Sequence, residues 1–144
     1  MKVVVQRSKS AFVSVKDKVV GKIDSGLVIL VGFTEKDSES VISKMVDKVI
    51  NLRIFDDENG VMNKSVLDVE KSILSISQFT LYADTSKGRR PSYVNALRGE
   101  DAIKLYDVWN EQLSRHVKVE TGEFGKEMEV SLINDGPVTI VIEL

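Results

Sequence analysis

The chain has 144 residues, of which 42% are hydrophobic and 29% are charged, and its formal net charge is −2. This length and composition predict one domain, residues 1-144, with an apolar core, and exclude a disordered chain. The absence of cysteine excludes disulfides, thiolate metal sites and cysteine nucleophiles, and it fits a reducing compartment. A weakly acidic chain is no general nucleic-acid binder, so any RNA contact must be local.

The first third of the chain shows strand patterns. Residues 3–5 open one strand, and residues 11–15 alternate in the manner of a second. Residues 16–18 are a plausible hairpin tip before a third strand at residues 19–23. Residues 27–33 are continuously apolar, but they fall far short of the about 20 residues that a membrane span needs. We therefore expect a buried strand there and no contact with a membrane.

A helix is predicted next. Apolar residues recur at helical spacing from residue 41 to residue 50, and the helix should end near Asn51. Asp37 or Ser38 can cap its start. Residues 56–60 then predict a hairpin turn that ends in an Asn-Gly pair. We reject a calcium loop at this acidic turn, because the required positions lack the glycine and the glutamate of an EF-hand.

The second half continues the mixed pattern. Residues 72–82 indicate a strand, residues 83–99 a long polar loop, and residues 100–117 a second helix with an apolar stripe. Strand alternation returns in three segments, residues 117–121, 128–132 and 138–144. The predicted fold class is α+β: a single domain with an antiparallel, barrel-like curved sheet and two main helices.

Few residues suggest chemistry by their type alone. His116 is the only histidine, and it lies near the C-terminal end of the second predicted helix, where a cation suits the helix dipole. Without a second histidine or any cysteine, neither a Ser-His-Asp nor a Cys-His arrangement is favoured. No cluster of residues calls for a metal or another cofactor, and we expect none. Tyr106 and Trp109 are assigned to the core.

Three other segments have both an ordinary and a functional interpretation. The basic residues Lys87, Arg89 and Arg90 can simply be solvated, or can bind phosphate if an active site is near. Ser77, Gln78 and Thr80, at the end of the strand predicted from residue 72, offer two hydroxyls and an amide to a site. A strand with one polar face explains these residues equally well. Gly-Pro at 136–137 lies between two predicted strands, where it bends the chain and leaves carbonyl groups without ladder partners.

Taken together, four segments resemble the D-aminoacyl-tRNA deacylase family, also called D-tyrosyl-tRNA deacylases. The similarity runs along essentially the whole chain and in the order of the family. Its departures are Ser8, where a valine is usual, Asp24-Ser25, where small residues are commoner, and Lys126, where alanine is common. The four segments are Ser77–Ala83, Lys87–Tyr93, Thr121–Gly125 with Met128, and Asn134–Thr139.

The resemblance implies a cytoplasmic homodimer that hydrolyses the ester between a D-amino acid and the 3′ end of tRNA. Its partners would be a second copy and the acceptor end of the tRNA, with no membrane and no DNA. The site would lie at the dimer interface, where Gly136 and Pro137 of the partner subunit, joined by a cis peptide, reach in. The residues implied for catalysis are Ser77, Gln78, Phe79 and Thr80, and those for substrate contact are Phe124 and Met128.

Two mechanisms stay open at this point. Thr80 is the obvious side-chain nucleophile, but no general base is visible for it. In the alternative, which we favour, the terminal 2′-hydroxyl of the tRNA helps to activate water. Selection of the D-form would come from exclusion of the L side chain, which predicts that glycyl-tRNA is also hydrolysed. The rival functions are removal of a mischarged L-amino acid, and a small RNA-binding or scaffold protein without catalysis.

Overall fold

One long strand organises the sheet. A computed structural model describes residues 1–144. Its first strand, β1 (Lys2–Val15), pairs antiparallel with β3 (Gly26–Gly32) along its first half and with β2 (Lys18–Ile23) along its second half. On its other side β1 pairs antiparallel with β8 (Glu129–Glu143) along most of its length. The strands predicted separately near each end of the chain are therefore two single long strands, β1 and β8.

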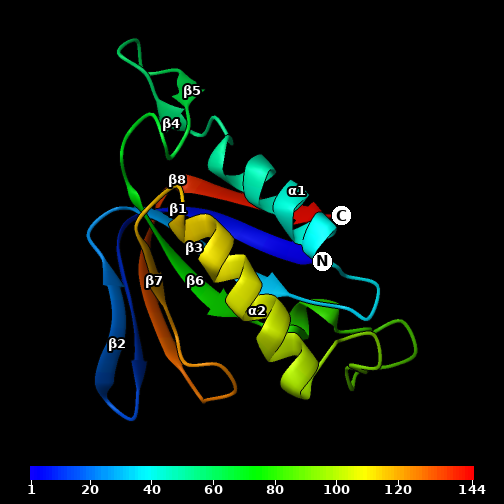
Figure 1. The fold of residues 1–144 in the computed structure, drawn as a ribbon. Coiled ribbons are helices and arrows are strands. Elements are labelled where there is room, and N and C mark those ends of the chain that lie inside the picture. The colour runs from blue at the N-terminus through cyan, green and yellow to red at the C-terminus, as the bar shows by residue number, and fades with distance from the viewer.

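The helices make the sheet mixed. α1 (Glu39–Ile50) lies in the connection from β3 to β6 (Ser72–Ser77), and α2 (Gly99–Ser114) in the connection from β6 to β7 (Val119–Thr121). Both strand pairs are parallel, as crossover connections through a helix require. The α+β class and the barrel-like curved sheet are confirmed, with two parallel pairings that the sequence did not predict. Figure 1 shows both helices on one face of the sheet.

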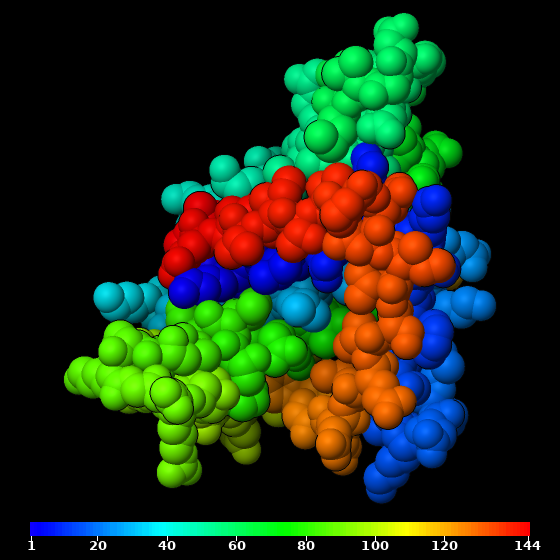
Figure 2. All heavy atoms as spheres, turned by 180° about the vertical axis from the view of Figure 1, so that it is seen from behind, coloured from blue at the N-terminus to red at the C-terminus, as the bar shows by residue number.

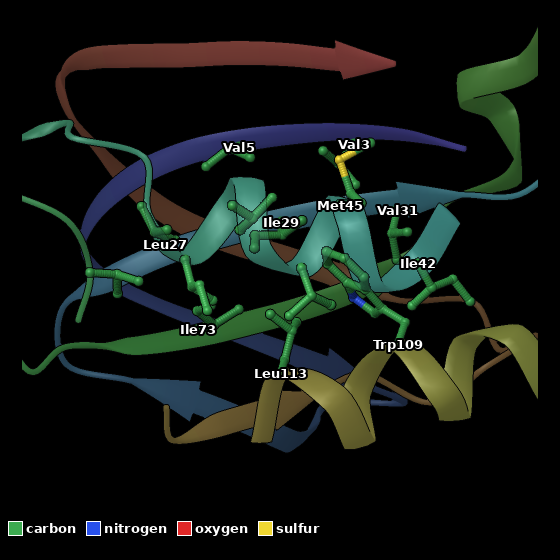
Figure 3. Close-up of a cluster of buried hydrophobic side chains, with 14 of the residues drawn as sticks. Val3, Val5, Leu27, Ile29, Val31, Ile42, Met45, Ile73, Trp109 and Leu113 are labelled. Atoms are coloured by element: carbon green, nitrogen blue, oxygen red, sulfur yellow. The ribbon is translucent and has the colours of Figure 1, made fainter. Parts of the chain in front are cut away.

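The core lies between the sheet and the two helices. The indole of Trp109 is fully buried, and its Nε1 donates to Ser75 Oγ of β6 at 3.1 Å. Tyr106 OH donates to the main-chain oxygen of Ser75 at 2.8 Å, so both core predictions for α2 are confirmed. Figure 3 shows the apolar side chains that meet there: Val3, Val5, Leu27, Ile29 and Val31 from the sheet, with Ile42, Met45, Trp109 and Leu113 from the helices.

The predicted turn at residues 56–60 forms a hairpin that projects from the body (Figure 1). Its strands are β4 (Phe55–Asp56) and β5 (Met62–Lys64). Asp57 accepts hydrogen bonds from the main-chain N–H groups of Asn59 and Val61, at 2.9 and 3.1 Å. These bonds hold the acidic tip and lower the pKa of the Asp57 carboxyl below its usual value.

Two predicted boundaries are wrong. The strand predicted to reach residue 82 ends at Ser77. The next residue, Gln78, makes the last hydrogen bond to β3, from its N–H to the main-chain oxygen of Val31 at 2.7 Å. The chain then turns into a short 3₁₀ helix, η1 (Phe79–Tyr82). α2 ends at Ser114 rather than at residue 117, and the exposed His116 lies just beyond it. No helix is both long and apolar enough to cross a membrane.

Candidate active site

A cavity of about 450 Å³ opens where β6 ends. Ser77, Gln78 and Phe79 line one side, and Phe124 and Met128, from the connection between β7 and β8, line another. The face seen in Figure 2 is hollowed between the segment near residue 90, in green, and the segment near residue 127, in orange. The structure thus brings together five residues that were predicted from the sequence, from two segments that are 45 to 51 positions apart.

Close packing of β3 against Gln78 shapes one wall. A Cβ atom on Gly32 would lie 2.8 Å from the main-chain oxygen of Gln78, so only glycine allows the two strands to approach this closely here. The Gln78 side chain turns back along the chain, and its Nε2 donates to Thr80 Oγ1 at 2.5 Å. The Thr80 hydroxyl therefore interacts with an amide, and Thr80 itself does not line the cavity.

The core fixes the opposite wall. The ring of Phe124 packs against Tyr106 of α2, with the ring centroids 5.7 Å apart. Tyr106 is held in turn by its bond to Ser75, and burial raises the pKa of its hydroxyl, so it stays a neutral donor. Met128 packs so closely on Gly122 that a Cβ atom there would lie 2.5 Å from its sulfur. Both cavity residues are therefore held by contacts with the rest of the domain.

Two cations lie in the lining. Arg98, just before α2, places its guanidinium carbon 4.8 Å from the ring centroid of Phe79 and 5.6 Å from that of Tyr93. Lys126 comes from the same connection as Phe124. Arg98 was not among the site residues predicted from the sequence. The available signal was an arginine at the point where the long polar loop meets the second helix.

The basic residues Lys87, Arg89 and Arg90 lie outside the cavity lining. All three are exposed and form no ion pair. Their loop is closed by two main-chain bonds between Asp84 and Ser92, of 2.8 and 2.9 Å. Figure 1 shows this loop extending away from the body beyond the first turn of α2. Their side chains are thus free to meet solvent or a phosphate.

Gly136 and Pro137 do not line the cavity of their own protomer. They are exposed in the middle of β8, and the peptide bond between them is cis. The segment is held from both sides: Arg7 Nε donates to the oxygen of Asp135 at 3.2 Å, and Asn134 Oδ1 accepts from the N–H of Val138 at 3.0 Å. The segment is therefore anchored, while its outward surface stays open.

Arg7 lies below the Gly-Pro segment, and no role was predicted for it from the sequence. It is only 8% exposed and follows Val3 and Val5 on the inward face of β1. Its position in the strand alternation could have identified it from the sequence, because a charged residue on an apolar face needs buried partners. It finds them in Asp135, in the main-chain oxygen of Ile54 at 2.7 Å and in the carboxylate of Asp56 at 3.3 Å.

The cavity can polarise a carbonyl group better than it can remove a proton. Its lining contains a hydroxyl, an amide and two cations, but no carboxylate and no imidazole. The first N–H groups of a helical turn lack partners within the turn, and η1 starts at Phe79 beside the cavity. Such donors stabilise an oxyanion that forms on an ester carbonyl.

A family model and similar sequences agree on one family. The family model described as D-Tyr-tRNA(Tyr) deacylase matches residues 4–143. Proteins named D-aminoacyl-tRNA deacylase from Bacillus cytotoxicus and Bacillus thuringiensis are 54% and 55% identical over 144 residues, which is 99% of this chain and 99% of each relative.

Two solved structures share the fold. One, named c-Myc DNA Unwinding Element Binding Protein, is 39% identical with a TM-score of 0.95, covering 100% of this chain and 99% of its own. The other is described as a probable eukaryotic D-amino acid tRNA deacylase. It is 18% identical with a TM-score of 0.85, covers 99% of this chain and 98% of its own, and supports the fold alone.

Proposed function

The chain belongs to the D-Tyr-tRNA deacylase family, and we propose that it hydrolyses the ester that joins a D-amino acid to the 3′ end of tRNA. The products are free tRNA and the D-amino acid, and the proposed setting is the cytoplasm. The cavity at the end of β6 is the observation that carries this proposal. The cavity volume of about 450 Å³ falls within the range typical of small-molecule sites. The cavity also offers hydrogen-bond donors to an ester carbonyl.

We propose that the active protein is a homodimer. β8 pairs only with β1, so its other edge is open. Exposed apolar side chains accompany that edge, with Ile133 57% and Val141 67% exposed. An open strand edge with exposed apolar side chains can pair with another chain. In a dimer with two-fold symmetry, the β8 edges of both copies would be covered by the same contact.

In this dimer, Gly136 and Pro137 of the partner subunit complete the cavity. A wall of main-chain carbonyl groups would accept the α-amino group of the substrate and leave room only for hydrogen on one side of the α-carbon. An L side chain would clash there or leave polar groups buried and unpaired, at about 1–3 kcal/mol for each group. Glycine has no side chain and would pass, so glycyl-tRNA is expected to be a second substrate.

The proposed chemistry uses the substrate itself. The terminal 2′-hydroxyl of the tRNA orients a water molecule, whose oxygen attacks the ester carbonyl carbon. The bond from that carbon to the 3′-oxygen breaks, and the 3′-oxygen takes up the proton that the attacking water loses. N–H groups at Phe79 and Thr80 would stabilise the negative charge that develops on the carbonyl oxygen. The Thr80 hydroxyl, bonded to Gln78 and without a base, is the weaker candidate for attack.

The basic loop is proposed to contact tRNA phosphates outside the cavity. Replacement of Lys87, Arg89 and Arg90 by alanine should weaken tRNA binding uniformly. Each lost contact should also reduce the slope of log affinity against log salt by about 0.7–0.9. Binding that stays unchanged in both respects would mean that the loop is only solvated. The solved relative named for DNA binding makes a DNA duplex the natural competitor in the same assay, and we expect it to compete poorly.

Hydrolysis of D-tyrosyl-tRNA by the purified protein tests the proposal, with Gln78→Ala as the site variant. The Gln78 amide lines the cavity and uses one N–H for Thr80 Oγ1, so the variant removes its second N–H as a donor to the substrate, which should lower kcat by about a hundredfold. Gln112→Ala, on α2 and outside the cavity lining, is the matched control and should behave as the wild type. A wild-type protein that leaves the D-ester intact, or a Gln78 variant with full activity, would count against the proposed function.

A further inference from the structure

The strongest feature not used by the proposed reaction is the cluster of Arg98, Phe79 and Tyr93 at the cavity. Phe79 and Tyr93 meet edge to face, with ring centroids 5.1 Å apart, and the guanidinium of Arg98 lies within 6 Å of both rings. Phe79 is 44% exposed although it is aromatic. Cation–π contacts of this kind hold a guanidinium in place and leave its N–H groups free to donate.

The charge of Arg98 has no partner in the protein. The side chain of Arg98 forms no ion pair and donates no hydrogen bond, and the same holds for the side chain of Lys126, the other cation of the lining. The acidic residues that follow Arg98, Glu100 and Asp101, lie outside the cavity lining, and Asp101 is paired with Lys104. The cavity thus has a positive lining whose donors are unsatisfied.

We propose that Arg98, held by Phe79 and Tyr93, binds the phosphodiester on the 5′ side of the terminal adenosine of the tRNA. This inference rests on the proposed function. If the aminoacyl-adenosine occupies the cavity, its 5′-phosphate must leave through the part of the lining that is exposed, and Arg98 is an exposed cation there. A guanidinium fork matches a phosphate in two parallel hydrogen bonds. The exposed ring of Phe79 beside it suits the stacking of an unpaired base.

Comparison of two substrates tests the site. D-tyrosyl-tRNA carries the phosphodiester, whereas D-tyrosyl-adenosine, the same ester on a nucleoside, lacks it. Arg98→Ala should raise KM for the tRNA about tenfold, the factor expected for one charge-assisted contact, and leave kcat unchanged. KM for the nucleoside ester should not move. Tyr93→Leu, which removes one of the two rings that hold Arg98, should also raise KM for the tRNA, but by a smaller factor.

Arg115→Ala is the matched control, because it removes the same charge at the other end of α2, where Arg115 pairs with Glu111. It should leave both KM values unchanged. An Arg98→Ala variant that changes both substrates equally would assign Arg98 to the aminoacyl-adenosine or to the fold. One that changes neither would leave it without a role. Either result overturns the proposed phosphodiester site.

Binding without catalysis separates this proposal from the proposed function. The ribotrinucleotide CCA without an amino acid, which carries the phosphodiester, and adenosine, which lacks it, are the two probes, and their binding is measured by calorimetry. Arg98→Ala should weaken binding of CCA about tenfold and leave that of adenosine unchanged. This comparison is informative even if the wild type hydrolyses no ester, a result that would count only against the proposed function. Equal effects on the two probes, or none, would refute the site.

Discussion

Arg7 Nε lies 3.2 Å from the main-chain oxygen of Asp135, so a buried cation of β1 holds the residue directly before Gly136. The same guanidinium reaches Ile54 and Asp56 at the base of the β4–β5 hairpin. A Cβ atom added to Gly136 would lie 2.8 Å from Cγ2 of Val138, with Arg7 Nη2 on another side at 3.4 Å. The exposed Gly-Pro segment is thus built on a fixed base.

Replacement of Arg7 by methionine should loosen that base. The oxygen of Ile54 would lose a buried charged donor, which lowers the free energy of unfolding by about 1–3 kcal/mol. If the segment selects the D-form, the ratio of D- to L-ester hydrolysis should fall as well. Urea unfolding and paired time courses measure the two effects. Lys2→Met, on the same strand and paired with the exposed Glu143, is the control. A destabilised variant with an unchanged D/L ratio would contradict a role in selection.

Thr80→Ala should keep measurable deacylase activity, because the Thr80 hydroxyl has an amide and not a base as its partner. By contrast, tRNA that ends in 2′-deoxyadenosine should not be turned over. Single-turnover rates with both substrates and both proteins measure this. Loss of all activity in the alanine variant, together with normal turnover of the deoxy substrate, would establish Thr80 as the nucleophile instead.

A mixture of two inactive variants tests whether the site is shared between subunits. Gly136→Ala leaves the cavity intact, whereas Gln78→Ala leaves the Gly-Pro segment intact. A mixed dimer would hold one complete site, so equal mixing after unfolding and refolding should restore about a quarter of wild-type activity if subunits combine at random. If Gly136 served its own subunit, each protomer would carry one defect, and the mixture would stay inactive.

The class of the fold could be predicted from sequence, and the shape of the sheet only in part. α1 was predicted to within two residues, because its apolar residues recur at helical spacing and pack on the core. The division of β1 and β8 was wrong, because a bulge or a Gly-Pro pair interrupts the alternation within one continuous strand. The parallel pairings leave no local signal, since they depend on how the helices cross.

The candidate site, too, could be predicted from the sequence only in part. Resemblance brought residues 77–79, Phe124 and Met128 to attention, and the structure gathers them at one cavity. Arg98 was missed because its role depends on rings from two other segments, which no spacing along the chain reveals. Thr80 does not line the cavity, because the chain leaves the strand at Gln78 and enters η1, and its part in catalysis stays a prediction.

The tyrosines predict a change at alkaline pH. Burial, together with the carboxylates of Asp37 and Glu143, raises the pKa of Tyr82, and burial raises that of Tyr106. Between the ordinary value of 10.0 and these raised values, the folded protein binds more protons than the unfolded chain. The free energy of unfolding should therefore fall as the pH rises above 10.0. Tyr82→Phe should reduce this fall, which urea unfolding at several pH values measures. An unchanged slope would contradict it.

The most direct test of the central claim is the rate of hydrolysis of matched D-tyrosyl-, L-tyrosyl- and glycyl-tRNA by the purified wild-type protein. Selection by exclusion predicts rapid loss of the D-ester, slower but measurable loss of the glycyl ester, and an intact L-ester. Loss of the L-ester would point to editing of mischarged L-amino acids. A stable D-ester would contradict the proposed function. An intact glycyl ester at high protein concentration would show that the site recognises the D side chain itself rather than excluding the L side chain.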